Sequence, residues 1–334
     1  MPPKRKKKIG TKRKTYKTKT RSKSANAKVK SKSEVTRFFK IGKEIDEGGY
    51  GTIFIANDNR KKMKVACKWM DLGTCTNDPR MLDTHNELTV LEQVRHPYII
   101  KVLCHFIVQA DGINNMYIFM ELAGGGNLYK YLQKQGLPNE ELSGKYFAQI
   151  LCGINHMHGY GIAHRDIKLQ NVLLVENARS ISGDFLMRVS DFGLSTTVKK
   201  DTYGNVQLNS TICGTPLFMA PELIDRKPYD AYQVDVWALG ISLYLILTLD
   251  VPFNFRQNLP NVVNDMKAKK WEWSDQMLSK PSPLLDSLMK SMLEPEPSQR
   301  IRLEDIINHK WISSYYQAAH ALSDQLKAEE YMNK

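Results

Sequence analysis

The sequence predicts an α+β fold in which a strand-rich first part leads into a larger helical part. Residues 38–45 and 52–56 alternate apolar and polar side chains, the period expected of two strands in a hairpin. A further apolar strand is predicted at 116–123. After it the apolar residues take a helical spacing, first over 128–135 and then over 140–158.

The positive charge of the chain is concentrated near its start. The 334 residues carry a net charge of +13, and residues 1–40 account for +16, so the remainder carries −3. Residues 1–36 have almost nothing apolar to bury and are predicted to form a disordered basic tail. Its lysines and arginines at 4–32 indicate a contact with a polyanion or an import receptor, or only a solvated segment. We expect an intracellular protein, in the nucleus, the cytoplasm or both.

Cysteine usage and hydropathy exclude several classes of protein. The cysteines are odd in number and form no C-x-x-C pair, which argues against a disulfide scaffold or a zinc site and suits a reducing compartment. They are Cys67, Cys75, Cys104, Cys152 and Cys213. No apolar segment follows the basic residues, so no secretory signal is expected. The longest apolar stretch, 236–249, is too short to span a bilayer and predicts a buried helix, so no membrane partner is expected.

A glycine-rich turn lies between the first two predicted strands. It reads Asp46-Glu47-Gly48-Gly49-Tyr50-Gly51. Glycine lets backbone N–H groups approach a phosphate because no Cβ stands in the way. Lys68 follows in a short apolar run, Val65-Ala66-Cys67-Lys68. Further on, 81–94 has a helical spacing and contains Glu87, and Pro97 ends that helix.

The residue run from His164 to Asn171 places a carboxylate, an ammonium and an amide at spacings i, i+2 and i+5. These are Asp166, Lys168 and Asn171, and Asp191-Phe192-Gly193 comes twenty residues later. The side-chain oxygens of Asn171 and Asp191 are hard ligands of the kind that magnesium prefers.

Together these motifs resemble a eukaryotic serine/threonine protein kinase over residues 38–312. The resemblance implies a bilobal fold with a small β-rich N-lobe and a larger, mainly helical C-lobe. It places the N-lobe and the hinge at 37–123, the C-lobe at 124–312 and a short helical extension at 313–334. It also implies ATP and Mg²⁺ as cofactors, proteins as substrates and an upstream activating kinase as a partner.

The resemblance assigns roles to individual residues. Asp166 would orient the substrate hydroxyl and accept its proton, Lys168 would stabilise the migrating phosphoryl charge, and Thr215 would bond to both. Asn171 and Asp191 would hold the metal. The nucleotide would be contacted by Ile45, Asp46, Glu47, Gly48, Gly49, Tyr50, Gly51, Thr52, Ile53, Ala66, Lys68, Glu87, Met120, Glu121, Ala123, Leu173 and Asp191. Glu121 and Ala123 would act through their backbones, so their side chains would matter little.

The stretch from Asp191 to Glu222 resembles an activation loop. Thr211 stands where the activating phosphate of the family falls, with Ser210 as a less favoured alternative and Arg165 as the phosphate's expected partner. Glu222 is expected to form a buried ion pair with Arg300. Residues 176–184 are interpreted as a tolerated surface insertion.

Several distinctions stay open at this point. The details of the loops look most like the calmodulin-dependent group, more weakly like its testis-specific serine kinase branch, and checkpoint-type kinases are the neighbouring alternative. Asn127 and Gln170 are neutral where many relatives have acids, so a strong preference for upstream arginine is not expected. Asp46 replaces the first glycine of the family's turn. It favours the rival hypothesis of a pseudokinase scaffold, and a third hypothesis gives the tail the main role, as a nucleic-acid tether.

Overall fold

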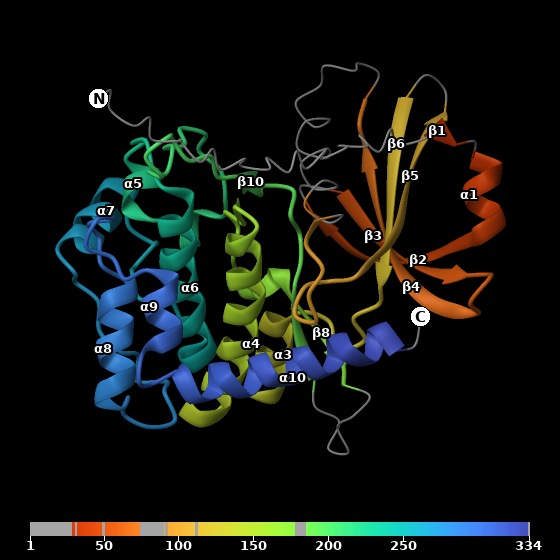
Figure 1. The fold of residues 1–334 in the computed structure, drawn as a ribbon. Helices are drawn as coiled ribbons and strands as arrows, with labels where there is room; N and C mark the ends of the chain where they lie inside the picture. The colour runs from red at the N-terminus through yellow and green to blue at the C-terminus, as the bar shows by residue number, and fades with distance from the viewer. Residues whose placement is uncertain are drawn as a thin grey trace, which may run out of the picture.

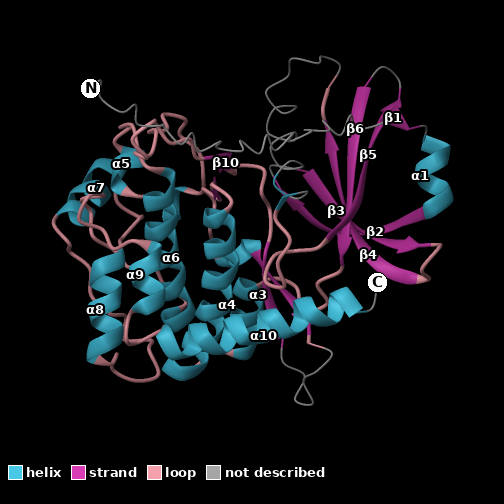
Figure 2. Cartoon of the chain, viewed as in Figure 1, coloured by secondary structure: helices cyan, strands magenta, loops and turns pink. Residues whose placement is uncertain are grey.

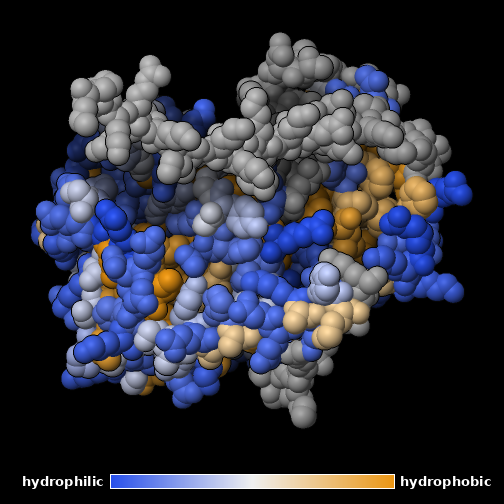
Figure 3. Space-filling view, viewed as in Figure 1, coloured by the Kyte–Doolittle hydropathy of each residue, from blue (hydrophilic) through white to orange (hydrophobic). Residues whose placement is uncertain are grey.

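The computed structural model describes residues 29–30, 32–48, 51–73, 90, 93–110, 113–177 and 185–332. The strands β1–β6 gather with helix α1 in one lobe, and most of the helices form the other lobe, as Figures 1 and 2 show. The predicted bilobal α+β fold is therefore confirmed. The face of the C-lobe seen in Figure 3 is largely hydrophilic, with hydrophobic patches between the polar side chains.

The N-lobe is built on a six-stranded sheet in the order β1-β5-β6-β4-β3-β2. All neighbours are antiparallel except β1 and β5, which run parallel. The strands are β1 (Val29–Lys30), β2 (Phe39–Gly48), β3 (Gly51–Asp58), β4 (Met63–Asp71), β5 (Val102–Ala110) and β6 (Ile113–Glu121). The predicted hairpin is β2–β3, with Gly48 opposite Gly51.

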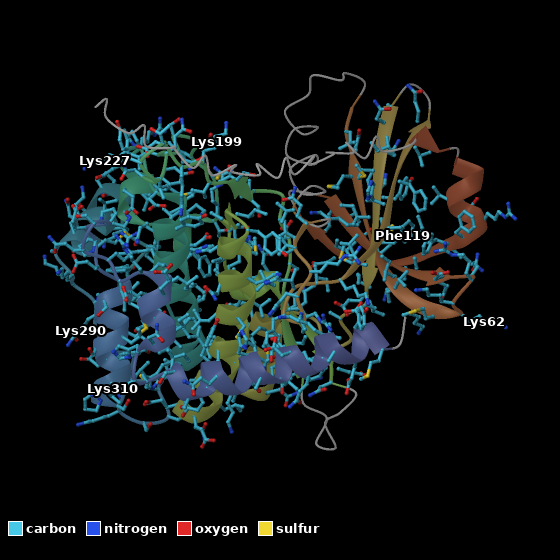
Figure 4. All side chains as sticks on the ribbon, in the orientation of Figure 1. Lys62, Phe119, Lys199, Lys227, Lys290 and Lys310 are labelled. Carbon is cyan, nitrogen blue, oxygen red and sulfur yellow. The ribbon has the colours of Figure 1, made fainter. Side chains whose placement is uncertain are left out.

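Helix α1 (Lys32–Phe38) covers one face of this sheet. Val35 of α1 is buried there, and Phe39 stacks on Phe119 with ring centroids 3.7 Å apart. Phe119 lies inside the lobe in Figure 4, whereas the labelled lysines lie at the periphery. The prediction that the tail reaches residue 36 is therefore wrong for its last part. Although the local sequence is polar, Val35 and Phe39 find apolar partners on distant strands, so the ordered chain includes 29–30 and 32–36.

The helix predicted at 81–94 falls mostly outside the described residues. Within them, Val94 N–H donates to the carbonyl of Val90 at 2.9 Å, a helical contact, and both side chains are buried. Glu87, Gly49 and Tyr50 also lie outside the described residues, as do residues 178–184 at the tip of the predicted insertion.

The lobes are joined where β6 ends, and short elements then carry the candidate site. Helices α3 (Leu128–Gln135) and α4 (Glu140–Gly159) begin at the N-caps Asn127 and Asn139. Next come β7 (Ile162–Ala163), the 3₁₀ turn η1 (Leu169–Asn171), β8 (Val172–Glu176), β9 (Phe185–Val189), β10 (Thr196–Thr197) and the 3₁₀ turn η2 (Pro216–Phe218). β8 pairs with β9, and β7 pairs with β10.

The C-lobe is organised around α6 (Ala231–Thr248), which begins at the N-cap Asp230. Among the described residues it is the one helix with the length and hydropathy to cross a membrane, and 89% of it is buried inside the fold. It is therefore the core helix predicted from the apolar run 236–249. Around it stand α5 (Pro221–Ile224), α7 (Leu259–Lys267), α8 (Pro283–Met292) and α9 (Leu303–Asn308).

Within the described residues 313–332, the predicted extension is helical, as expected. Helix α10 (Ser313–Met332) packs along α4 and continues beyond the C-lobe, so that its last turns lie beneath the strands of the N-lobe in Figure 1.

Candidate active site

The loop that contains Asp166 is held from below by one buried carboxylate. Asp235, in the first turns of α6, accepts the backbone N–H groups of His164 and Arg165 at 2.8 Å each. The His158 ring of α4 lies 2.8 Å from the same carboxylate. Asp235 is fully buried, and in a medium of low polarity such charge-assisted bonds are strong. The loop geometry is therefore fixed by the hydrophobic core.

Two aromatic rings set the direction of the Asp191-Phe192-Gly193 segment. Phe192 is buried, and its ring packs 5.4 Å from that of His164. The Asp166 N–H donates to Nδ1 of His164, so Nε2 carries the hydrogen and donates to the Ser190 carbonyl at 3.1 Å. Asp191 follows with φ of 64°, in the left-handed region that non-glycine residues seldom adopt. Phe192 thus points into the core, and Asp191 points to the lobe junction.

The predicted catalytic side chains converge on the carboxylate of Asp166. Thr215 donates from its backbone N–H at 3.0 Å and from its hydroxyl at 2.8 Å, both to Oδ1. Lys168 Nζ lies 2.7 Å from Oδ2 and 2.8 Å from the Thr215 hydroxyl. The Asn171 amide donates to Oδ2 at 3.0 Å and to the Asp166 backbone carbonyl at 2.9 Å. Two donors of the activation segment and two of the loop therefore fix this buried carboxylate in one orientation.

A glycine allows the activation segment to approach the loop this closely. Gly214 has φ of 107°, and a Cβ there would lie 2.8 Å from the carbonyl oxygen of Arg165. Any other residue would push Thr215 away from Asp166.

Lys68 of β4 reaches across the lobe junction to Asp191. Its Nζ lies 2.9 Å from Asp191 Oδ1, and the lysine side chain is buried. Burial by itself would raise the pKa of the Asp191 carboxyl, but the charge and hydrogen bond of Lys68 outweigh it and hold that pKa below its usual value. Asp191 is therefore ionised at neutral pH and carries the negative charge that a metal ion needs.

The glycine-rich hairpin lies at the N-lobe side of the junction. Gly51 has φ of 126°, and a Cβ there would lie 2.3 Å from the carbonyl oxygen of Trp69, so only glycine fits. Asp46, the departure from the family pattern, lies on the exposed strand β2, 3.7 Å from Lys130 of α3. Lys130 was not among the predicted site residues. It offsets part of the negative charge that Asp46 adds near a nucleotide.

The apolar residues predicted to hold the adenine ring come from both lobes. Ala66 and Met120 are neighbours across β4 and β6, and Ile53 of β3 is paired with Lys68. From the C-lobe, Leu173 of β8 forms a bridge with Asn127. Ile45 is 45% exposed on β2. The remaining predicted contacts among the described residues, Glu47, Gly48, Thr52 and Ala123, lie on β2, on β3 and just after β6.

The side chain of Glu121 differs from its sequence-based prediction. It was expected to matter little, yet its Oε1 accepts the Lys101 N–H at 2.7 Å and lies 3.2 Å from Arg188 Nε. Because Lys101 and Arg188 are distant along the chain, no local sequence signal marks this role. The hinge is therefore fixed by a side chain and not only by its backbone.

Thr211 is exposed, and one arginine, Arg165, is linked to it through Tyr229. Tyr229 donates its hydroxyl to the Thr211 carbonyl at 2.6 Å, and Arg165 Nη1 lies 3.2 Å from that hydroxyl. Arg165 also donates from Nε to the Leu194 carbonyl at 2.7 Å. Tyr229, which sequence reasoning missed, thus links the predicted phosphorylation site to the predicted phosphate partner.

The expected ion pair between Glu222 and Arg300 is present and buried. The guanidinium makes two hydrogen bonds to the carboxylate, at 2.8 and 3.0 Å, and also stacks over Trp237 with its Cζ 5.0 Å from the ring centroid. It closes the end of the activation segment onto α6.

The donors fit magnesium held jointly with a nucleotide. Both amide hydrogens of Asn171 point to Asp166, which leaves its oxygen as the atom offered to a cation, beside the ionised Asp191. Among the described residues no group of three or more His, Cys, Asp or Glu could hold a metal ion alone. Magnesium commonly binds through one or two protein oxygens with phosphates and water completing its shell. This donor set matches that mode.

A separate hollow lies away from the predicted site. It measures about 810 Å³, lies against α8 at the far end of the C-lobe, and is lined by Trp271, Trp273, Asp286 and Lys290 among others. None of the residues predicted to act in catalysis lines it.

Comparison with known proteins agrees with this geometry. Residues 39–312 match the protein kinase domain family, and the chain belongs to that family. It is 32% identical over 283 residues to CBL-interacting protein kinase 24 of Oryza sativa subsp. japonica, covering 84% of this chain and 57% of the relative. It is 31% identical to CBL-interacting serine/threonine-protein kinase 18 of Arabidopsis thaliana, covering 82% of this chain and 49% of the relative. With the human NUAK family SNF1-like kinase 1 it shares 28% identity, over 87% of this chain and 41% of the relative.

The chain therefore spans roughly half the length of the curated relatives that it matches. What these relatives have in common with it is the kinase domain, a family that generally uses ATP and magnesium.

Proposed function

We propose that this chain is a serine/threonine protein kinase, which transfers the γ-phosphoryl group of ATP to Ser or Thr hydroxyls of protein substrates. The observation that carries the proposal is the convergence of Thr215, Lys168 and Asn171 on the Asp166 carboxylate. The name of one relative, a serine/threonine-protein kinase, supports it.

The chemistry requires position and charge more than covalent participation. Asp166 orients the substrate hydroxyl and accepts its proton. Because its carboxylate is already held in one orientation, it does not have to reorient when the phosphoryl group is transferred. Lys168 offsets the negative charge on the phosphoryl group during its transfer. Lys68 holds the phosphates from the N-lobe side. Asn171 and Asp191 would hold magnesium, which would supply positive charge that neutralises the phosphate oxygens.

The test is transfer of labelled phosphate from ATP to a mixture of peptides whose acceptors are Ser, Thr or Tyr. We expect phosphoserine and phosphothreonine from the wild type and a loss of about a thousandfold or more with Asp166→Ala. Product confined to tyrosine would contradict the acceptor class. Nucleotide-dependent partner binding with no transfer by the wild type would favour the scaffold instead.

We further infer that phosphorylation of Thr211 activates the chain. Thr211 is exposed, and Arg165 is connected to it through Tyr229. A movement of the Arg165 side chain would therefore bring its guanidinium to a phosphate on Thr211. Thr211→Ala should prevent activation by an upstream kinase, whereas the neighbouring Ser210→Ala should not. Equal activation of both variants would reject Thr211 as the site.

Substrate selection follows from two neutral residues. Asn127 is buried and caps α3, accepting the Lys130 N–H at 2.9 Å, and Gln170 is exposed. Neither offers the negative charge that selects a basic side chain. A peptide array should show no strict requirement for upstream arginine.

The group and location of the kinase are also proposals. The relatives support the calmodulin-dependent group, but their names give no support to the testis-specific branch. The lysines and arginines at 4–32, which lie almost entirely outside the described residues, are proposed to contact a polyanion or an import receptor, with the protein in the nucleus, the cytoplasm or both. Binding to nucleic acid that does not weaken with salt would reject the polyanion contact.

A further inference from the structure

Helix α10 lies beyond residues 39–312, the part of the chain that matches the family, yet it contacts both lobes. It packs along α4 in the C-lobe and passes beneath the hinge side of the molecule toward the N-lobe sheet (Figure 1). Its role therefore cannot be taken from the family and has to be derived from its contacts.

One face of α10 is anchored by buried residues. Tyr316, Ala319 and Ser323 are buried at spacings of three and four, the period of one helix face. The Ala319 carbonyl accepts the hydroxyl of Tyr98 at 2.9 Å, and the Tyr316 hydroxyl accepts the Asn155 amide at 2.9 Å. Tyr98 belongs to the loop 96–101, which leads into β5. The helix is therefore hydrogen-bonded to that loop and to α4 together.

At the C-terminal end of α10, a series of charged groups links the helix to the loop 96–101 and to the hinge. Glu330 lies 2.5 Å from Lys101 Nζ, and the backbone N–H of Lys101 donates to Glu121 at the hinge. The same Glu121 oxygen lies 3.2 Å from Arg188 Nε, an ion pair without an aligned hydrogen bond. Arg188 Nη1 in turn lies 3.4 Å from the Ile99 carbonyl.

Two of these groups lie on strands that lead to the predicted nucleotide site. Arg188 lies on β9, three residues before Asp191, and Glu121 ends β6, where the adenine edge is expected. Burial raises the pKa of Glu121, the charges of Arg188 and Lys101 oppose that rise, and Glu330 adds to it. All four side chains therefore act on one electrostatic network.

We propose that α10 is a positioning element of the nucleotide site, and that Glu330, Lys101, Glu121 and Arg188 are its positioning residues. By fixing the loop 96–101 and the hinge against α4, the helix holds the orientation in which Lys68 of the N-lobe meets Asp191. The inference rests on the proposed function, because it concerns how ATP is held.

The first test displaces the helix. Ser323 is small and fully buried, so Ser323→Arg should displace the second half of α10 from its packing against α4. The matched control is Ala321→Arg, which places the same side chain on the exposed face. Because misplacement by about an ångström is costly in an active site, we expect the Kd and KM for ATP to rise about tenfold in Ser323→Arg. The KM for the peptide should be unchanged in Ser323→Arg. In Ala321→Arg, the Kd and KM for ATP should equal those of the wild type.

The second test leaves the packing of α10 unchanged and alters only the charges of Glu330 and Lys101. Glu330→Lys and Lys101→Glu each place like charges together, and the double variant restores opposite charges in reverse order. Both side chains are about half exposed, so each single change should weaken ATP binding by only about two- to fivefold. The double variant should recover most of that loss, which a merely structural defect would not do.

The outcomes separate the two proposals. A wild-type chain that does not bind ATP overturns the proposed function and the role of α10 with it. If the wild type binds ATP and the folded Ser323→Arg variant binds it with the same affinity, the positioning role alone is overturned. If Ser323→Arg fails to fold, the charge exchange decides: recovery in the double variant supports the role, and no loss in the singles, or no recovery, overturns it.

Discussion

The loop around Asp166 and the glycine-rich hairpin face each other across the lobe junction, but they are held in opposite ways. The loop rests on the buried carboxylate of Asp235 and is fixed by hydrogen bonds from three directions. On the hairpin, residues 42–47 of β2 are all exposed, and the pairing of β2 with β3 is irregular between Ile41 and Asp46. The groups proposed to take part in chemistry are thus fixed by the core, whereas the strand proposed to cover the phosphates has few buried contacts. Such a strand is free to adjust to a nucleotide.

The largest effect should come from the support of the loop. In Asp235→Asn one accepting oxygen becomes a donor that faces a backbone N–H, so about 3 kcal/mol of unfolding free energy should be lost. We also expect kcat to fall about a hundredfold. Denaturant unfolding and transfer assays measure the two effects. Asp250→Asn, at an exposed position just after α6, is the control and should change neither.

The next effect concerns stability and leaves the chemistry intact. Glu222→Gln leaves the Arg300 guanidinium buried without its counter-charge and should lower the unfolding free energy by about 3 kcal/mol. The KM for ATP should stay the same in the folded fraction. The exposed pair Glu141–Lys145 provides a matched control, since Glu141→Gln should not change stability measurably. Equal effects of the two variants would show that burial does not set the strength of these pairs.

A smaller effect should appear as a dependence of stability on pH. Burial lowers the pKa of His96 to about 3, and electrostatic repulsion from His156 on α4, from Lys327 and His320 on α10 and from Arg188 on β9 adds to this effect. The unfolded chain takes up a proton near pH 6.5 and the folded chain does not, so stability is full above pH 6.5 and falls as the pH drops below it.

Replacing His96 by Asn should remove this contribution. Between pH 6.5 and 5.5 the slope of unfolding free energy against pH should become shallower by up to about 1.4 kcal/mol per pH unit. Above pH 7.5 the two curves should run parallel. An unchanged slope below pH 6.5 would mean that His96 is not buried as a neutral ring.

The smallest effect should come from the exposed hairpin. Asp46→Gly removes a negative charge near the phosphates and should lower the KM for ATP about two- to threefold. Lys130→Met should raise it, because Asp46 then loses its cation 3.7 Å away. An unchanged or raised KM in Asp46→Gly would contradict this account of the departure from the family's turn.

Sequence reasoning succeeded where the signal is local. The residues from His164 to Asn171, the Asp191-Phe192-Gly193 segment and the apolar run of α6 each carry their pattern within a few positions, and the structure brings the first two together as expected. The buried pair Glu222–Arg300 was predicted through the resemblance, although its partners are 78 residues apart.

The failures concern contacts whose partners are distant and have no motif. Helix α1 is ordered because Val35 and Phe39 meet Phe119, which the local composition of the tail does not reveal. The anchoring of α10 depends on Tyr98, 221 residues before Ala319. Glu121 was interpreted as a backbone contact because the polar partners of its side chain, Lys101 in the loop before β5 and Arg188 on β9, are distant and have no motif.

The central claim is that Lys68, Asn171 and Asp191 together hold ATP with its metal ion next to the Asp166 carboxylate, and calorimetry of ATP binding with and without magnesium tests it most directly. The wild type should bind at least about tenfold more tightly with magnesium. Asp191→Asn should bind weakly and equally in both conditions, while Asp166→Asn should keep the magnesium dependence. Wild-type binding that is indifferent to magnesium, or Asp191→Asn that responds to it as the wild type does, would contradict the account.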